Sequence, residues 1–318
     1  LPDEGSVAGA RAVRDLAEAA NASEGVLVLI SGGASALVDV LRPGVDLQTL
    51  SRINAWLLAN GRSIDEINAV RRRLSLLKGG GLAALLRPRR VTGLLISDVE
   101  GDDPAVIGSG LLYPGSAPQV MPVGVPDWLT RILERLPEPE PEPAAEPAPP
   151  HRVLANLQTA CEAAARRVRQ EGLVAHLHPV ELDGDAATTG AELARRLLGE
   201  LPAGIHIWGG ETTVRLPDRP GRGGRNQHLA LAAASVLAGQ TGVCLLAIGT
   251  DGSDGPTEDA GALVDGGTLR RGELRGLDAA EQLRRADSGS FLEASGDLIS
   301  TGPTGTNVRD LVIAWKGP

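Results

Sequence analysis

Seven glycine-rich polar clusters divide this chain, and most of them follow or face a short apolar run. Glycine lets backbone N–H groups approach an anion closely, and neighbouring Ser, Thr, Asp and Arg side chains supply charge and hydrogen bonds. One such loop would be an ordinary turn, but several at the ends of predicted strands indicate a composite phosphate site. The clusters span residues 31–35, 78–81, 97–103, 209–213, 221–227, 249–257 and 301–307.

The first cluster reads SGGAS and lies between the apolar run VLVLI and a segment that could start a helix. A strand, a glycine turn and a helix N-terminus together form an anion cradle, although a tight turn is the alternative. Ser31, Gly32, Gly33 and Ser35 are therefore candidate substrate- or phosphate-binding residues. The cluster is not a P-loop, because the chain contains no GxxxxGK[ST], and no GxGxxG fingerprint follows a strand.

A polar stripe runs beside the apolar face of the helix predicted over residues 63–77. Asn68, Arg71 and Lys78 recur on this stripe, which ends at the turn KGGG. A solvated helix edge would have the same pattern. An Arg and a Lys beside a glycine turn can equally hold a carboxylate or a phosphate. Arg71, Lys78 and Gly79 are therefore candidates for substrate binding.

Four acidic residues each follow a predicted apolar strand: Asp98, Glu211, Asp251 and Asp254. Carboxylates at neighbouring strand ends can hold Mg²⁺ while it binds phosphates. Taken singly, each is more often a turn or helix-capping residue. Because four of them occur together, we interpret them as candidate metal ligands.

The cluster GRGGRNQ runs directly into a predicted helix and places Arg225 near the helix start. The helix dipole disfavours a cation there, so an Arg at this position indicates an anionic partner. Asn226 follows it. The last cluster, TGPTGTN, offers Thr304 and Asn307 before the final strand, and we take both as candidate binding residues.

Strands and helices alternate along the chain, which predicts an α/β fold with a mostly parallel sheet. In such sheets ligands bind at the carboxyl ends of the strands. We expect strands at 26–30, 91–97, 174–182, 204–208, 243–249 and 307–315. We expect helices at 8–20, 47–60, 63–77, 125–136, 151–171, 186–198 and 225–237, with short helices before the last strand.

Composition limits the classes of function. The chain has 318 residues, 42% of them hydrophobic, and a net charge of −9, which argues against a nucleic-acid partner. No apolar run reaches about 18 residues, so we expect no membrane span. Cys161 and Cys244 read as buried free thiols, consistent with the cytoplasm. Residues 137–150 alternate Pro and Glu, which predicts an exposed loop that is dispensable for activity.

Taken together, these motifs resemble the class II glycerate kinases, the glycerate 2-kinases of the MOFRL family. The matching stretches occur in family order and are LPDEGSVAGA, SGGASAL, NAVRRRLSLLKGGGLA, SDVEGDDPAVIGSG, GGETTV, GGRNQHLAL, GTDGSDGPTEDAGALVD and TGPTGTNVRDL. The resemblance implies ATP- and Mg²⁺-dependent phosphorylation of D-glycerate at its 2-hydroxyl group. It also implies a large Rossmann-like, doubly wound domain over residues 1–200, a smaller α/β domain over 201–318, and an active site in the cleft.

The resemblance also implies that Arg225 is catalytic. Three positions depart from the family motifs: Ala34 replaces a glycine, Arg73 a histidine and His228 a glutamate. None of these changes removes an obvious charged centre. Family members carry a further stretch, with a lysine thought to act on the phosphate, before the segment that opens this sequence. We therefore expect an N-terminal part to be missing here.

Two alternative functions remain open at this point. One is an NAD(P)H-dependent hydroxypyruvate reductase, a name the family often carries, although the dinucleotide fingerprint is absent. The other is a non-catalytic module that binds a nucleotide or a sugar acid, if the missing lysine is essential. We expect small-molecule ligands and no nucleic-acid or membrane partner. The sequence leaves the oligomeric state open, a homo-oligomer included.

Overall fold

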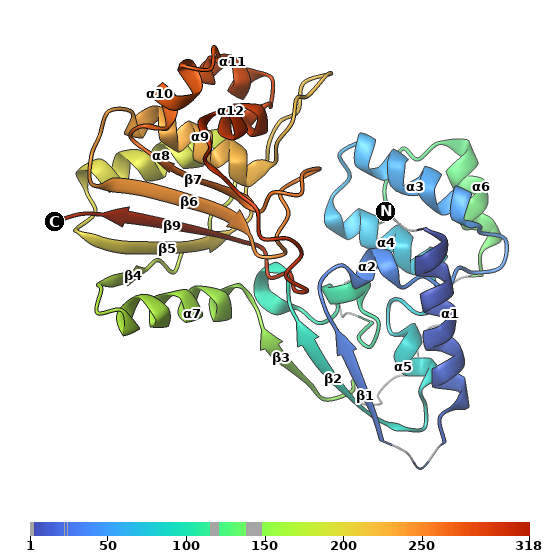
Figure 1. Ribbon diagram of the computed structural model, residues 1–318. Coiled ribbons are helices and arrows are strands. Elements are labelled where there is room, and N and C mark those ends of the chain that lie inside the picture. Colours follow the sequence, from blue (N-terminus) through green and yellow to red (C-terminus); the bar gives the residue numbers. More distant parts are fainter. Residues whose placement is uncertain (1–2, 22, 24, 115–120, 138–147) are drawn as a thin grey trace. The chain divides into compact units, whose positions relative to one another are not determined.

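The protein forms two compact units, Leu1–Leu154 and Ala155–Pro318. The computed structural model describes residues 3–21, 23, 25–114, 121–137 and 148–318 (Figure 1). Both units combine sheet and helix, which confirms the predicted α/β class and the arrangement in two domains. The domain limit expected between residues 200 and 201 stays a prediction. None of the described helices is long and apolar enough to cross a membrane.

The first unit contains a three-stranded sheet and a group of helices. Its elements are α1 (Glu4–Ala19), β1 (Gly25–Ile30), α2 (Ala34–Leu37), α3 (Leu47–Ala59), α4 (Ile64–Leu74), α5 (Gly81–Leu85), β2 (Arg90–Ile96), the 3-10 turns η1 (Glu100–Asp102) and η2 (Ile107–Ser109), α6 (Asp127–Arg135) and β3 (His151–Ala155). The sheet order is β1-β2-β3, with β1 and β2 parallel. Ile30 and Leu95 of these strands belong to one buried core, and a second core joins α3, α4 and α6.

The helix predicted over residues 151–171 is wrong in its first part. His151–Ala155 forms β3 at the edge of the first sheet, and α7 (Leu157–Gln170) begins only after it. Asn156 separates the two, because its side-chain oxygen accepts a hydrogen bond from the Thr159 amide at 2.9 Å. This is the N-cap geometry that Asn favours. The Pro–Glu segment expected to be a loop lies largely in residues 138–147, outside the described residues.

The second unit is a six-stranded sheet with helices on both faces (Figure 1). After α7 its elements are β4 (Ala175–Leu177), α8 (Ala186–Gly199), β5 (Gly204–Gly210), α9 (Arg225–Leu237), β6 (Val243–Gly249), β7 (Gly261–Asp265), α10 (Thr268–Glu273), α11 (Ala279–Arg284), α12 (Ser288–Ser295), β8 (Leu298–Ile299) and β9 (Asp310–Lys316). Alternate residues of β9 serve the two faces: Leu311 and Ile313 pack with α7, whereas Val312 and Ala314 join the core under α8 and α9. The predicted strand over 174–182 is shortened to β4.

The strand order of this sheet is β4-β5-β9-β6-β7-β8, and β9 is antiparallel to both of its neighbours. The prediction of a mostly parallel sheet is wrong for this unit, because among its described strands only β4 and β5 pair in parallel. The carboxyl ends of β5 and β6 therefore lie beside the first residue of β9. The register pairs Asp310 with Gly210 on one side and with Gly249 on the other. This edge carries the residues that follow β5 and β6, and it is where the predicted site residues of the second unit gather.

Candidate functional site

Arg225 is the first residue of α9 and is clamped by two carboxylates. Its Nε and Nη2 donate to Oδ2 and Oδ1 of Asp310 at 2.5 and 3.1 Å, a two-point pair. Its Nη1 lies 2.7 Å from Oε1 of Glu211. The Asp310 side chain is 7% exposed, whereas that of Arg225 is 35% exposed. The guanidinium group is thus fixed in orientation and still open to solvent on part of its surface.

The electrostatics of this clamp keep Arg225 charged. Burial alone would lower the pKa of its guanidinium group. The hydrogen bonds and charge of Asp310, with the charges of Glu211 and Asp254, raise the pKa above its ordinary value instead. An anionic partner was expected for Arg225 from its place at a helix start, and the protein supplies carboxylates of its own there.

Asp254 holds the amino end of α9. Its Oδ1 accepts from the Asn226 amide at 3.0 Å, and its Oδ2 accepts from the Gln227 amide at 2.8 Å. The Asn226 side chain also donates to Oδ1. Gly224, the residue before the helix, has no side chain to cap these amides, so Asp254 acts as a cap from another loop. Burial raises the pKa of Asp254 to about 6, although the two amides oppose the rise.

The loops after β6 and before β9 are joined by Thr250 and Thr304. The Thr304 hydroxyl donates to the Thr250 carbonyl at 2.6 Å, and the Thr304 amide donates to the Asp251 carbonyl at 3.1 Å. Asn307 accepts from the Arg309 amide at 2.9 Å. Gly249, the last residue of β6, lies close to both Asp251 and Asp310. A Cβ atom added at this glycine would be 3.0 Å from Oδ1 of Asp251 and 3.6 Å from Oδ1 of Asp310. Asp251 therefore lies close to the Arg225 clamp.

The described carboxylates do not fit a preformed magnesium centre. Both oxygens of Asp254 accept backbone amides, and Arg225 engages both oxygens of Asp310. Asp251 accepts from the Ser253 amide at 3.0 Å. Across the described ranges, no group of three or more His, Cys, Asp and Glu side chains could hold a metal ion. The metal role suggested for Asp98, Glu211, Asp251 and Asp254 stays a prediction.

In the first unit, Lys78 is buried rather than open to solvent. Its Nζ donates to Oδ1 of Asp39 at 2.6 Å and to the Ser35 carbonyl at 2.7 Å. Burial raises the pKa of Asp39, and attraction to Lys78 opposes that rise. The Ser109 hydroxyl bridges to the side chains of Ser35 and Asn68, at 3.1 Å each. Ser35, Asn68 and Lys78, which the sequence indicated, are thus linked through Ser109 and Asp39, which it did not.

The other candidates of the first unit lie at turns. Ser31 and Gly33 are exposed between β1 and α2, and Gly33 has φ of 83°. Gly79, with φ of 61°, donates its amide to the Ser109 carbonyl. Arg71 lies near Asn54, with Nε 3.5 Å from the amide oxygen. The half-buried Asp98 follows β2, as predicted, and Gly32 lies in the first turn.

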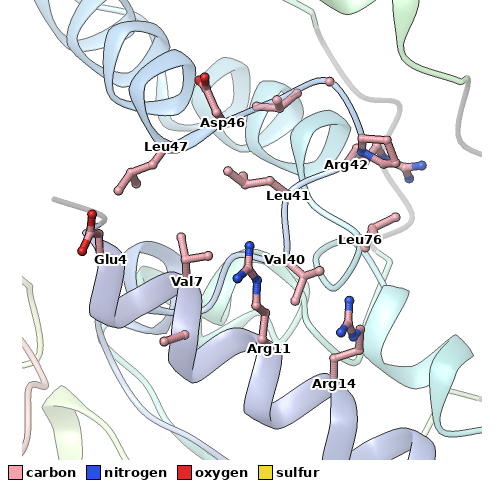
Figure 2. Close-up of a pocket in the computed structure, with 14 residues that line it drawn as sticks. Glu4, Val7, Arg11, Arg14, Val40, Leu41, Arg42, Asp46, Leu47 and Leu76 are labelled. Carbon is pink, nitrogen blue, oxygen red and sulfur yellow. The ribbon is translucent and has the colours of Figure 1, made fainter.

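A cavity of about 690 Å³ in the first unit contains none of the predicted site residues. Arg11 and Arg14 extend from α1 on one side of it, and Arg42 lies on the segment across from them (Figure 2). Arg14 pairs with Asp15 at 2.8 Å. Arg11, Arg14 and Arg42 lie outside the motifs found in the sequence.

A second cavity, of about 340 Å³, lies beside Arg225 in the second unit. We call it the Arg225 pocket. Its lining consists of Thr212, Thr213, Val214, Leu216, Gly223, Gly224, Arg225, His228, Gly255, Pro256 and Ala286. The sequence indicated Arg225, but it indicated neither Asp310 nor Asp39, nor that His228 lines the Arg225 pocket. A His in the first turn of a helix that Arg225 begins was the available signal.

Comparison with known proteins gives the family. Residues 1–124 match the Domain of unknown function (DUF4147), and residues 204–310 match the MOFRL family. The D-glycerate 2-kinase of Thermotoga maritima is 38% identical over 98% of this chain and 77% of its own length. The chain belongs to the glycerate kinase family. This confirms the resemblance found in the sequence motifs.

A solved structure supports this family, whereas one further relative has the name of a different enzyme. The crystal structure of glycerate kinase from Thermotoga maritima is similar to this chain, with a TM-score of 0.82 and 35% identity over 99% of this chain and 78% of that one. A family member from Agrobacterium vitis is 36% identical over 98% of this chain and 84% of its own length. The name of that relative is "Putative hydroxypyruvate reductase".

Proposed function

We propose that this chain phosphorylates D-glycerate at its 2-hydroxyl group with ATP. Membership of the glycerate kinase family carries the proposal, because a relative named D-glycerate 2-kinase matches 98% of the chain. In the reaction the hydroxyl oxygen forms a bond to the γ-phosphorus, the bond from that phosphorus to the bridging oxygen breaks, and the hydroxyl proton leaves. Phosphoryl transfer depends on positioning and charge neutralisation more than on covalent chemistry.

Arg225 is our choice for the group that neutralises charge on the transferring phosphoryl group. It is part-exposed, held by Asp310 from one side, and kept charged by its surroundings. A fixed guanidinium group needs no reorganisation when charge develops, which is what makes such stabilisation effective. Glu211 is the more exposed of the two partners of Arg225, at 45%. We propose that an incoming phosphate displaces Glu211 and takes its place beside the guanidinium group.

We assign supporting roles to the remaining candidates. Thr304, Asn307 and Asn226 are proposed to position the loops and the helix end around Arg225. In the first unit, the residues proposed to bind substrate or phosphate are Ser31, Gly32, Gly33, Ser35, Arg71 and Gly79. Lys78 is buried against Asp39 and is proposed to contribute there by holding Ser35, whose carbonyl it contacts. Mg²⁺ is proposed to enter with the nucleotide, since the described carboxylates offer no ready metal centre. When bound, the ion supplies positive charge to the phosphate oxygens.

The localisation that we propose is the cytoplasm. Cys161 and Cys244 are both free, and burial raises the pKa of Cys161 to about 11. A buried thiol of high pKa behaves as a small apolar side chain rather than as a reactive group.

One experiment separates the candidate activities. The purified chain is mixed with ATP, Mg²⁺ and D-glycerate, and 2-phosphoglycerate is measured directly. In parallel, NADH oxidation is followed with hydroxypyruvate, the reaction suggested by the name of one relative. Product in the first assay and none in the second supports the kinase. NADH oxidation without 2-phosphoglycerate would replace it with the reductase, and neither reaction would leave a binding protein.

A further inference from the structure

The Arg225 pocket has two chemically different parts. Four of its lining residues are apolar, and we call them the apolar wall: Val214, Leu216, Pro256 and Ala286. Leu216 is 64% exposed on this wall. The other part is Arg225, which supplies positive charge to the lining. A ligand that matches both parts needs an apolar face joined to an anionic group.

Three of the lining residues are glycines: Gly223, Gly224 and Gly255. Gly255, with φ of 60°, packs against Gly224 so closely that a Cβ there would lie 3.0 Å from the Gly224 Cα. Gly223 and Gly224 lead into α9 and also line the pocket. A glycine places no side chain in the pocket, so these three positions leave room for a ligand.

His228 supplies a polar group from the buried side. The residue is 7% exposed and lines the pocket one helical turn beyond Arg225. Its Nδ1 lies 2.9 Å from the Ser288 hydroxyl. Among the described residues, no partner bonds its Nε2. Burial lowers the pKa of His228, so the ring is neutral near pH 7. Its Nε2 can then donate or accept a hydrogen bond with an uncharged polar group of a ligand.

We propose that the Arg225 pocket binds the base and ribose of the phosphoryl donor, with its phosphates directed to Arg225. The inference rests on the proposed kinase activity, since it assigns one half of that reaction's donor site. Glycerate itself is a poor match, because a three-carbon acid with two hydroxyl groups has no apolar face for the wall. A purine ring has an apolar face and a hydrogen-bonding edge, and the cavity of about 340 Å³ falls in the range of small-ligand sites.

The test uses one charge on the wall and one matched control. Leu216→Glu places a carboxylate where the base would lie, close to the incoming phosphates. Leu274→Glu makes the same change at a leucine of the second unit that is 75% exposed and does not line the pocket. Titration with a fluorescent ATP analogue, without glycerate, is expected to show about tenfold weaker binding for Leu216→Glu and wild-type binding for Leu274→Glu.

A second variant guards against misfolding of the first. His228→Gln keeps a group that can bond Ser288 and is also expected to weaken the analogue, with an unchanged circular dichroism spectrum. Equal analogue affinity in all four proteins would overturn the assignment. So would a raised KM for glycerate with an unchanged KM for ATP in Leu216→Glu. Pocket-dependent ATP binding without any phosphorylation of glycerate would support the pocket while removing the proposed function.

Discussion

Arg225 and Asp310 form a two-point ion pair although 85 positions separate them in the sequence. Arg225 begins α9, and Asp310 begins β9, which runs opposite to β5 and β6. The reversed strand brings its first side chain to the edge where the other two strands end. The pair therefore depends on the direction of β9 as much as on the two residues, and it orients the only group that we propose as catalytic.

Replacement of Arg225 tests its role in charge neutralisation. Arg225→Ala is expected to lower kcat by roughly 10²- to 10³-fold, because loss of one preorganised charge-stabilising group commonly has this effect. Steady-state kinetics with varied glycerate and ATP would measure it. A variant with near-normal kcat and a raised KM for glycerate would instead give Arg225 a role in ground-state binding.

Asp310 is expected to act by positioning Arg225. Asp310→Asn keeps the size of the side chain but removes the charge, so we expect kcat to fall roughly tenfold with a smaller change in KM, as for other residues that orient a functional group. Asp297→Asn is the matched control, because Asp297 is 9% exposed and pairs with Arg271 at 2.5 Å. Equal losses of kcat in both variants would show a general effect on folding and no positioning role.

The sequence predicted Arg225 because a glycine turn before a helix is a local signal. Asp310 carried no such signal, since we expected a strand over residues 307–315 with Asp310 in its interior. Neither the order of the strands nor the reversal of β9 can be read from apolar periodicity, which is the same for both directions. Glu211 and Asp251 could be predicted because each lies within two residues of the end of its own strand, β5 or β6.

Lys78 shows a second limit of the sequence. The polar stripe and the glycine turn at residues 78–81 predicted an open binding residue, but the Lys78 side chain is fully buried against Asp39. Asp39 comes after α2, and its distance of 39 positions from Lys78 gave no reason to pair them. Similarly, His151–Ala155 forms a strand because it pairs with the edge of the first sheet. The local helix propensity of these residues does not reveal that pairing.

The Asp39–Lys78 pair is expected to matter for stability. Asp39→Asn leaves a buried ammonium group without its counter-charge, and loss of one partner of a buried pair costs about 3–5 kcal/mol. Glu171→Gln is the control, since that residue pairs with Arg167 at 2.6 Å on the surface and should cost below about 1 kcal/mol. Urea unfolding would compare them. Similar small losses would mean that Lys78 finds water or another acceptor.

Capping of α9 by Asp254 gives a further prediction. Asp254→Ala removes an acceptor from two backbone amides in a buried place, so we expect a loss of about 2–3 kcal/mol in the free energy of unfolding. Asp278→Ala is the comparison, because Asp278 caps α11 at an exposed end by accepting from the Glu281 amide at 2.7 Å, and should cost about 1 kcal/mol. Equal values would show that water replaces the buried cap. A large loss of activity in Asp254→Ala at full stability would favour the predicted metal role.

A stack of aromatic rings beside β4 and β5 predicts acid sensitivity. His178 stacks on Trp208 with ring centres 4.3 Å apart, and its Nε2 lies 3.1 Å from Nδ1 of His206. Burial, with the nearby charge of His206, lowers the pKa of His178 to about 4. An unfolded chain binds this proton near pH 6.5, so the folded state holds fewer protons between the two values. The contribution to stability is therefore complete above about pH 6.5 and is lost as the pH falls toward 4.

We expect the Tm of the wild type to fall more between pH 7 and pH 4 than that of His178→Gln, which has no titrating ring there. His151→Gln, outside the stack, should keep the wild-type slope. Parallel Tm curves for all three proteins would show that the stack does not couple folding to protons in this range.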